Sequence, residues 1–205
     1  MMQLVAMAAM LADHIGLVFF PDNETYRIVG RVAFPLYCWF LVQGYLHTRD
    51  VRKYMIRLFG LAVLSQIPYS LALGKSDLNV IFTLLLALAG LYAADRLSTD
   101  TGRMAMLALV LGTAALVPMD YGLYGVLLVF IYRHSRGWML IGLHLLLNGL
   151  FWAMNGMGHW IQLYSIAGSL IIALPLPLPG RLPWRWVYRT FYPVHLVVLS
   201  VLSFG

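Results

Sequence analysis

The chain has 205 residues, of which 61% are hydrophobic and only 11% are charged, and its mean hydropathy is +0.80. Soluble domains carry about 25% charged residues, so this composition excludes an ordinary soluble protein and indicates an integral membrane protein. The formal net charge of +6 does not indicate nucleic-acid binding, because the basic residues fall in loops between apolar runs, where they meet anionic lipid headgroups.

Apolar runs recur along the whole chain and are separated by short polar turns. A helix needs about 20 apolar residues to cross a bilayer. Nine candidates cover residues 3–20, 29–46, 54–73, 78–95, 103–118, 121–133, 137–154, 159–176 and 186–203. The border between the fifth and sixth runs is unclear, which leaves eight or ten as alternatives. The sequence predicts an all-α, polytopic bundle that forms a single transmembrane domain over residues 1–205.

The distribution of Lys and Arg predicts the orientation of these spans. With nine spans, 11 of the 14 basic residues fall on one side of the membrane. Only Arg27, Arg31 and Lys75 fall on the other side. Basic residues concentrate in cytoplasmic loops, so we expect a cytoplasmic N-terminus and a periplasmic C-terminus. The last cytoplasmic crossing, Leu174 to Trp184, is rich in proline and is expected to be extended.

Two adjacent ionisable residues, Asp13 and His14, interrupt the first apolar run. Arg31, near the outer end of the second span, is expected at a depth that the Asp13 carboxylate can reach. Ionisable groups at such depth are costly and usually serve a site. The alternative is a purely structural ion pair between Asp13 and Arg31. Adjacent helical residues point about 100° apart, so Asp13 and His14 cannot face one narrow pocket in the same way.

Further polar residues fall at the same predicted level, from the membrane centre to the outer leaflet. They are Gln66, Asn79, Thr83, His144, Asn148 and His195. Amides and hydroxyls in membrane helices more often join helices than bind substrates, and a histidine can be satisfied within a bundle. No metal site is predicted, and the single cysteine, Cys38, permits no disulfide.

A second cluster lies at the predicted cytoplasmic boundary between the second and third spans. It comprises His47, Thr48, Arg49, Arg52, Lys53, Tyr54 and Arg57. Its simplest explanation is membrane topology. Several guanidinium groups at a helix boundary also suit phosphate or pyrophosphate groups. We refer to these residues as the basic cluster.

Several strings in this sequence together resemble the TraX family of membrane proteins, which are associated with acetylation of the N-terminus of conjugative pilin. The similarity covers almost the whole chain in order. The strings are LADHIG at 11–16, GRVAFP at 30–35, GYLHTR at 44–49, SQIP at 65–68, NVIFTL at 79–84 and FYPVHL at 191–196. Gln43 is a departure, because the family pattern has an acidic residue before Gly44, which puts activity or acceptor choice in doubt.

The resemblance implies an acyltransferase of the bacterial inner membrane that moves an acetyl or other acyl group from cytoplasmic acyl-CoA to an amine or hydroxyl. The acceptor would lie at the outer side of the membrane, as the N-terminus of a pilin does. We expect His14 to act as the base, with Asp13 as its orienter or as the ion partner of Arg31. His195 is the second candidate for the base, and the basic cluster is expected to hold the phosphates of CoA.

Arg31, Gln66 and Asn79 are expected to line the acceptor and the oxyanion, with Thr83 and His195 as further contacts to the substrate. Two other functions remain open from the residues. One is a small-solute or proton-coupled transporter, which would also use acidic, imidazole and guanidinium groups at mid-membrane. The other is a pilus assembly factor without catalysis. The acceptor, the acyl chain, an acyl-enzyme intermediate and the oligomeric state are not readable from the sequence.

Overall fold

The computed structural model describes residues 2–174 and 185–204, and in these residues the regular structure is helical. The one pairing of extended backbone recorded there is an isolated bridge between Leu78 and Met119. The all-α prediction is confirmed for this part of the chain. The extended crossing predicted for Leu174 to Trp184 lies, from residue 175 onward, outside the described residues.

Each predicted span corresponds to one helix or to two consecutive helices. The elements are α1 (Met2–Phe19), α2 (Glu24–Gly30), α3 (Ala33–His47), α4 (Val51–Leu73), α5 (Val80–Ala94), α6 (Asp100–Leu116), α7 (Gly122–His134), α8 (Gly137–Asn155), the 3₁₀ helix η1 (Met157–Ser165), α9 (Ile166–Ala173) and α10 (Arg185–Phe204).

Three of the described helices, α1, α4 and α8, are long and apolar enough to cross a membrane. At a rise of about 1.5 Å per residue, helices of this size extend about 27 to 34 Å, which matches a hydrocarbon core of about 30 Å. This is consistent with a membrane protein. The apolar stretches of α5, α7, η1 with α9, and α10 are shorter, and that of α10 covers Thr190–Ser203. The count of nine spans therefore stays a prediction.

The structure differs from the sequence prediction at the second span, where a turn at Arg31 and Val32 separates α2 from α3. Pro35 explains the break. Proline has no backbone N–H, and its ring would clash with the carbonyl of Arg31 in a continuous helix. Pro35 is instead the third residue of α3, in the first turn, where the missing N–H has no intrahelical partner to lose.

The predicted eighth span is also divided, because η1 precedes α9. Gly156 ends α8 with φ +79. This left-handed conformation is accessible to glycine at little cost, so α8 can end there and the chain can turn back.

The contacts divide the chain into two compact units that alternate along the sequence. Unit 1 comprises Met1–Tyr37, Ile67–Lys75 and Ser135–Gly205, and unit 2 comprises Cys38–Gln66 and Ser76–His134. The prediction of one transmembrane domain stays a prediction.

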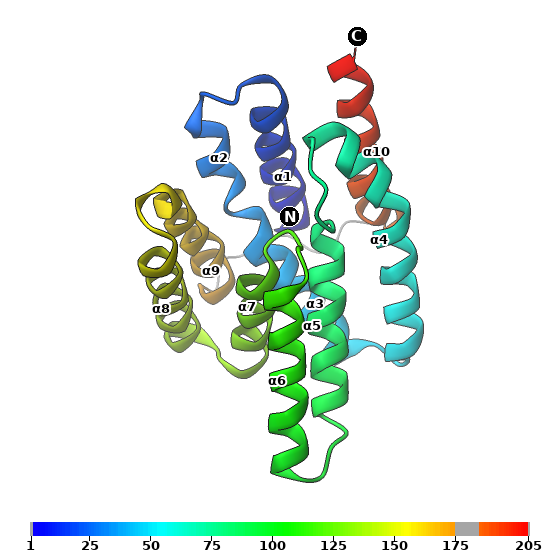
Figure 1. The fold of residues 1–205 in the computed structure, drawn as a ribbon, viewed down its shortest axis with the longest axis vertical. Helices are drawn as coiled ribbons and strands as arrows, with labels where there is room; N and C mark the ends of the chain where they lie inside the picture. The colour runs from blue at the N-terminus through cyan, green and yellow to red at the C-terminus, as the bar shows by residue number, and fades with distance from the viewer. Residues whose placement is uncertain (1, 175–184, 205) are drawn as a thin grey trace. The chain divides into compact units, whose positions relative to one another are not determined.

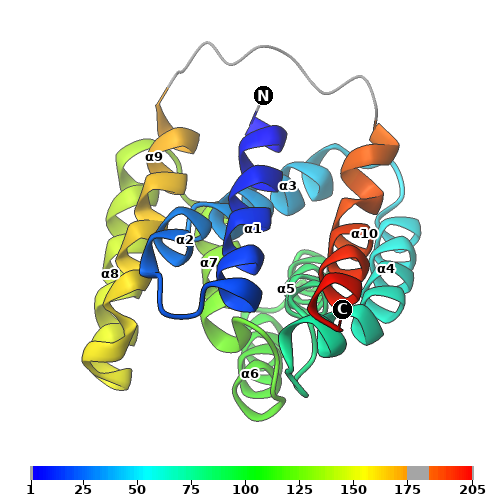
Figure 2. The ribbon, with the colours of Figure 1, turned by 90° about the horizontal axis from the view of Figure 1, so that it is seen from above.

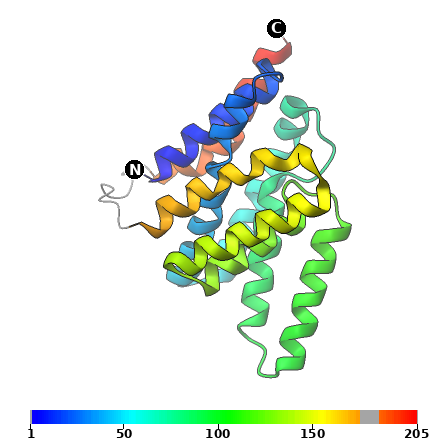
Figure 3. The ribbon, with the colours of Figure 1, turned by 90° about the vertical axis from the view of Figure 1, so that its left-hand side faces the viewer.

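In unit 1, α1 packs against α2 and α10, and it lies between them when seen from above (Figure 2). The helices α1 and α2 form a hairpin (Figure 1). Helices α8 and α9 also lie side by side, joined by η1, which contacts α2 (Figure 3). The N-terminal hairpin and α10 therefore bring the residues 11–16, 30–35 and 191–196 into one unit.

In unit 2, α5 packs against both α6 and α7. Gly90 permits the close approach of α6, because a methyl group there would lie 2.9 Å from Cγ2 of Val110. Several large apolar side chains of α4 and α6 are exposed in the structure, among them Ile56, Leu64 and Leu116. Such exposure is expected of helix faces that meet lipid rather than water.

Candidate functional site

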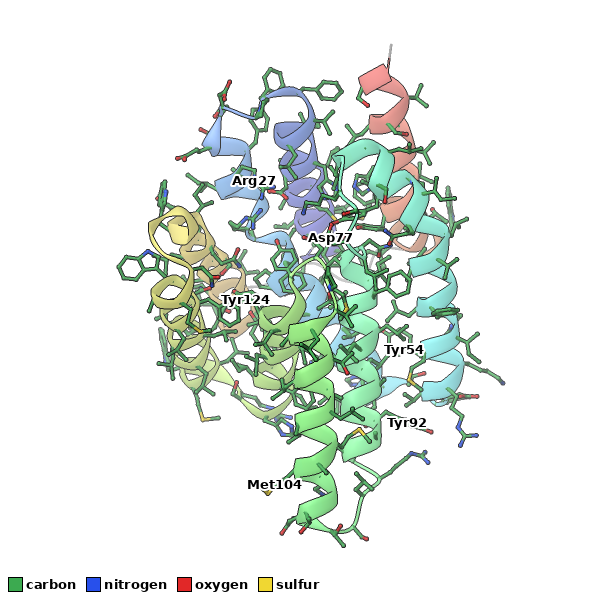
Figure 4. The ribbon with its side chains drawn as sticks, viewed as in Figure 1. Arg27, Tyr54, Asp77, Tyr92, Met104 and Tyr124 are labelled. Atoms are coloured by element: carbon green, nitrogen blue, oxygen red, sulfur yellow. The ribbon has the colours of Figure 1, made fainter. Side chains whose placement is uncertain are left out.

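The carboxylate of Asp13 is held between two arginines of α2. Its Oδ2 lies 2.9 Å from Nη1 of Arg27, and its Oδ1 lies 3.1 Å from Nη2 of Arg31. The side chains of Asp13 and Arg31 are 12% and 11% exposed, whereas that of Arg27 is 28% exposed. Figure 4 shows Arg27 on α2, beside α1. One negative charge therefore meets two positive charges, and the trio keeps a net positive charge.

Two glycines allow α1 and α2 to approach closely enough for these ion pairs. A methyl group on Gly30 would collide with Cβ and Oδ1 of Asp13, and one on Gly16 would collide with Cβ of Tyr26. Small residues at such crossings are typical of membrane helices, where close packing replaces the hydrophobic effect. The carboxylate thus occupies the space that a larger residue at position 30 would fill.

Arg31 also joins the hairpin to η1. Its Nη1 donates to Oε1 of Gln162 at 3.0 Å, and its Nε donates to the carbonyl of Arg27 at 3.3 Å. The amide nitrogen of Gln162 is buried without a hydrogen-bond partner. The Arg31 guanidinium is thereby fixed in one orientation by α1, α2 and η1.

His14 faces a different neighbour. Its Nδ1 lies 2.7 Å from Nε2 of His195 on α10, and the two rings are nearly parallel, at 10°, with centroids 5.0 Å apart. His195 in turn places Nδ1 2.7 Å from the carbonyl of Phe191. The ring of Tyr192 meets both imidazoles edge on. This arrangement makes a buried pair of imidazoles, with His14 7% and His195 5% exposed.

Asp13 and His14 therefore serve two separate helix contacts, as their angular separation on α1 requires. Of the two roles expected for Asp13, the structure has the ion pair with Arg31. The hydrogen bond described for Nδ1 of His14 goes to His195 and not to Asp13. The two histidines that were predicted as first and second candidates for a base are in direct contact.

Gln66 and Asn79 come together in unit 2. Oε1 of Gln66 accepts from the backbone N–H and from Nδ2 of Asn79, at 3.0 and 2.9 Å. Nδ2 of Asn79 also donates to the carbonyl of Ala62, and Oδ1 of Asn79 accepts from the N–H of Ile81 and caps α5. These amides fasten the loop before α5 to α4, which is a structural role. Their contact with an acceptor stays a prediction.

Thr83 lies on α5, one turn beyond Asn79. Its Oγ1 donates to the carbonyl of Asp120 at 2.6 Å, and the side chain is fully buried. The neighbouring Leu78 exchanges backbone hydrogen bonds with the segment 118–120. Thr83 therefore ties the turn before α7 to α5.

The basic cluster surrounds the turn between α3 and α4. The side chains of His47, Arg49, Arg52, Lys53 and Arg57 are exposed. Asp50 lies at the centre of the turn and accepts from the backbone N–H of Lys53 at 3.0 Å, which holds the pKa of this carboxyl below its usual range. The structure thus brings together the residues predicted for CoA.

Two tyrosines organise this end of unit 2, and both are labelled in Figure 4. Tyr54 packs against α3, because a methyl group on Gly44 would lie 2.8 Å from its hydroxyl oxygen. The hydroxyl of Tyr92 accepts from Nε of Arg52 at 3.3 Å, and its ring lies 4.1 Å from the guanidinium carbon of Arg96. Tyr54 therefore positions the helix that carries the cluster, and Arg96 adds a charge to it.

A second buried histidine network joins α8 to η1 and α9. Nδ1 of His144 lies 2.5 Å from Oγ of Ser169, and Nε2 lies 3.1 Å from Oγ of Ser165. Asn148 donates to Ser165 at 3.1 Å. All four side chains are buried. Both nitrogens of the imidazole are engaged by hydroxyls, which fits the role of a polar contact between helices.

The sequence prediction missed Arg27 as a partner of Asp13, because it was assigned to an exterior loop. Its position four residues before Arg31 was the available signal, since residues i and i+4 share one helix face. Arg27 and Arg31 lie on the face of α2 that meets Asp13. This relationship can be predicted only if α1 and α2 are recognised as a hairpin.

The described part of the chain is helical, buries polar residues between its helices and has three helices long and apolar enough to cross a membrane, which is consistent with a helical membrane protein. The family model described as TraX protein matches residues 1–203, and the chain belongs to that family. The chain is 32% identical to the probable fimbrial assembly protein FimC, serogroup H1, of Dichelobacter nodosus, with 97% of this chain and 92% of that protein covered.

It is also 29% identical to the protein TraX of Escherichia coli, over 97% of this chain and 84% of that protein. The uncharacterized protein RP591 of Rickettsia prowazekii is 35% identical, but the match covers 45% of this chain and 36% of that protein. No solved structure matches the chain.

Proposed function

We propose that this protein is a membrane-embedded acyltransferase that moves an acetyl group from cytoplasmic acetyl-CoA to an amine at the outer side of the bacterial inner membrane. Membership of the TraX family supports this proposal. The observation that carries it is the buried contact between His14 and His195, because an imidazole held by a second group at one nitrogen is the usual form of a general base.

The proposed reaction needs a base, an electrophile and a leaving group. The amine of the acceptor attacks the thioester carbonyl, a C–N bond forms, and His14 takes the proton of the amine. The C–S bond then breaks, and the CoA thiolate leaves and takes that proton from the imidazolium. The products are an amide and CoA, and the base returns to its starting state.

The charges of the ion-paired trio beside α1 suit the intermediate of this reaction. The Asp13, Arg27 and Arg31 trio has a net positive charge, and Arg31 is immobilised by three hydrogen bonds. A fixed positive charge stabilises an oxyanion more than a mobile one does, because no reorganisation is needed during the reaction. We propose that Arg31 serves the oxyanion.

The basic cluster fits the donor by its chemistry. CoA carries phosphate and pyrophosphate groups, and guanidinium groups bind these through paired hydrogen bonds. The exposed Arg49, Arg52 and Arg57 surround one turn, and Tyr92 holds Nε of Arg52. We propose that these residues bind the phosphates of acetyl-CoA from the cytoplasm.

The acceptor is proposed from the relatives. One of them is named a probable fimbrial assembly protein, so we propose the N-terminal amine of a pilin or of another envelope protein. The same name favours a second candidate function, an assembly factor that binds pilin without chemistry. The two candidates differ in whether the mass of the acceptor changes.

Intact-mass spectrometry of a pilin co-expressed with this protein tests the proposal. The acyltransferase function predicts that the pilin gains one acetyl group at its N-terminus, and that His14→Gln abolishes the gain. His134→Gln is the matched control, because His134 is exposed at the end of α7, and it should leave the modification intact. An unchanged pilin mass with the wild-type protein, together with capture of pilin, would support the assembly factor and refute the enzyme.

A further inference from the structure

The hydrogen bonds of α10 determine which nitrogen of His14 can accept a proton. A carbonyl oxygen only accepts, so Nδ1 of His195 must carry the proton that it shares with the carbonyl of Phe191. In a neutral imidazole the other nitrogen is then unprotonated. Nε2 of His195 therefore presents a lone pair to His14.

The same rule applies to the next ring. Since Nε2 of His195 accepts, Nδ1 of His14 must donate across the 2.7 Å between them. This leaves Nε2 of His14 as the unprotonated nitrogen. The carbonyl of Phe191 thus determines the tautomer of His195, and His195 in turn determines the tautomer of His14.

Both rings are neutral in this assignment. The imidazoles are 7% and 5% exposed and are surrounded by Phe191, Tyr192 and each other. An imidazolium held in the resting protein within a membrane would need a counter-ion. The carboxylate next in sequence, Asp13, binds Arg27 and Arg31 instead. A charged His195 would also donate from Nε2 and reverse the tautomer of His14.

We propose that His195 is a positioning residue that holds His14 as the Nδ1–H tautomer, so that Nε2 of His14 is the atom that accepts the proton of the acceptor amine. This inference rests on the proposed acyl transfer, and it replaces the expectation that His195 contacts the substrate. His195 acts through His14, and their rings lie at only 10° to one another across the hydrogen bond, so His195 also holds the plane of the His14 ring. The step requires no other reactant than the amine and the thioester.

The inference predicts a distinct pattern for two substitutions at one position. In His195→Phe an aromatic ring remains at the position, but the acceptor for Nδ1–H of His14 is lost. We expect His14 to change to the Nε2–H tautomer and acyl transfer to fall about 100-fold, within the range of a lost general base. In His195→Gln the side-chain oxygen can accept at the same distance, so transfer should recover to within about 10-fold of wild type.

Nitrogen NMR of the full chain, labelled with ¹⁵N in the histidine rings and reconstituted in lipid nanodiscs, tests the tautomer directly. The signal of His14 is assigned by its loss in His14→Gln. The inference predicts a protonated Nδ1 and an unprotonated Nε2 for His14 in the wild type, and an exchange of these states in His195→Phe. A wild-type His14 with a protonated Nε2 would overturn it, as would a His195→Phe variant with unchanged tautomer and unchanged transfer.

The outcome separates this inference from the proposed function. If the wild type shows the predicted tautomer but no pilin is acetylated, the acyltransferase function fails and the positioning of His14 stands as a structural fact. If pilin is acetylated while His14 carries its proton on Nε2, the function stands and His195 is not the positioning residue.

Discussion

Oδ1 of Asp13 lies 3.1 Å from Nη2 of Arg31, and both side chains are nearly buried. The second oxygen of the same carboxylate binds Arg27, which is more exposed. A carboxylate with two arginines is stable in a membrane only if all three groups stay together. The hairpin of α1 and α2 is therefore expected to depend on this trio.

A double-mutant cycle should rank the two ion pairs of Asp13. We expect a coupling energy of about 1–3 kcal/mol between Asp13→Asn and Arg31→Gln. The coupling with Arg27→Gln should be below about 1 kcal/mol, because solvent screens the more exposed pair. Free energies of unfolding in mixed micelles measure both. Equal couplings would show that burial does not decide the strength of these pairs.

Gly30 should not tolerate a side chain. Gly30→Ala would push a methyl group into Asp13, and overpacking of this kind costs about 1–3 kcal/mol. Gly60→Ala is the control, because nothing lies within 4 Å of a methyl group at that position in α4. Alanine there should stabilise by up to about 1 kcal/mol. The order of the thermal midpoints in detergent checks this, and a stable Gly30→Ala variant would refute the close contact.

Asn79 should contribute more to stability than an exposed helix cap does. Asn79→Ala removes the cap of α5 and one of the two hydrogen bonds that the part-buried side chain of Gln66 accepts from residue 79. We expect a loss of about 2–3 kcal/mol. Thr99→Ala removes the exposed cap of α6 and should cost about 1 kcal/mol. Similar unfolding free energies for the two variants would count against the amide network.

The basic cluster should determine how tightly acetyl-CoA binds and should not change the rate of the chemical step. Replacing Arg49 and Arg57 by Ala is expected to raise the KM for acetyl-CoA about 10-fold with kcat within about twofold, since only binding is lost. Arg103→Ala, at an exposed arginine that pairs with Asp100, is the control. The variants are compared by transfer rates over a series of acetyl-CoA concentrations. A lower kcat at unchanged KM would show that these arginines contribute to the chemical step and not to binding of acetyl-CoA.

The helical architecture was predictable from the sequence because apolar runs of the right length specify membrane helices. The break between α2 and α3 was also encoded, by Pro35, but hydropathy averages over a whole run and hides a single proline. Hydropathy alone does not give the number of spans, since three of the helices in residues 2–174 and 185–204, α1, α4 and α8, reach the length and apolarity of a full crossing.

The site was predictable in part. Asp13, His14 and Arg31 stood out because their charge or titration is costly within a membrane, and the pair of Asp13 with Arg31 is confirmed. The contact between His14 and His195 joins residues 181 positions apart. Nothing in the sequence around either histidine gives their distance, because that distance depends on the packing of α1 against α10.

The most direct test of the account is acetyl transfer by the purified protein in proteoliposomes, with labelled acetyl-CoA added and a pilin with a free N-terminus as acceptor. The account predicts that label appears on the N-terminal amine of the pilin with the wild type and with His134→Gln. It predicts a loss of about 10²- to 10⁴-fold with His14→Gln, the range for a missing general base. Transfer at the wild-type rate by a folded His14→Gln protein, or no transfer by the wild type, would contradict it.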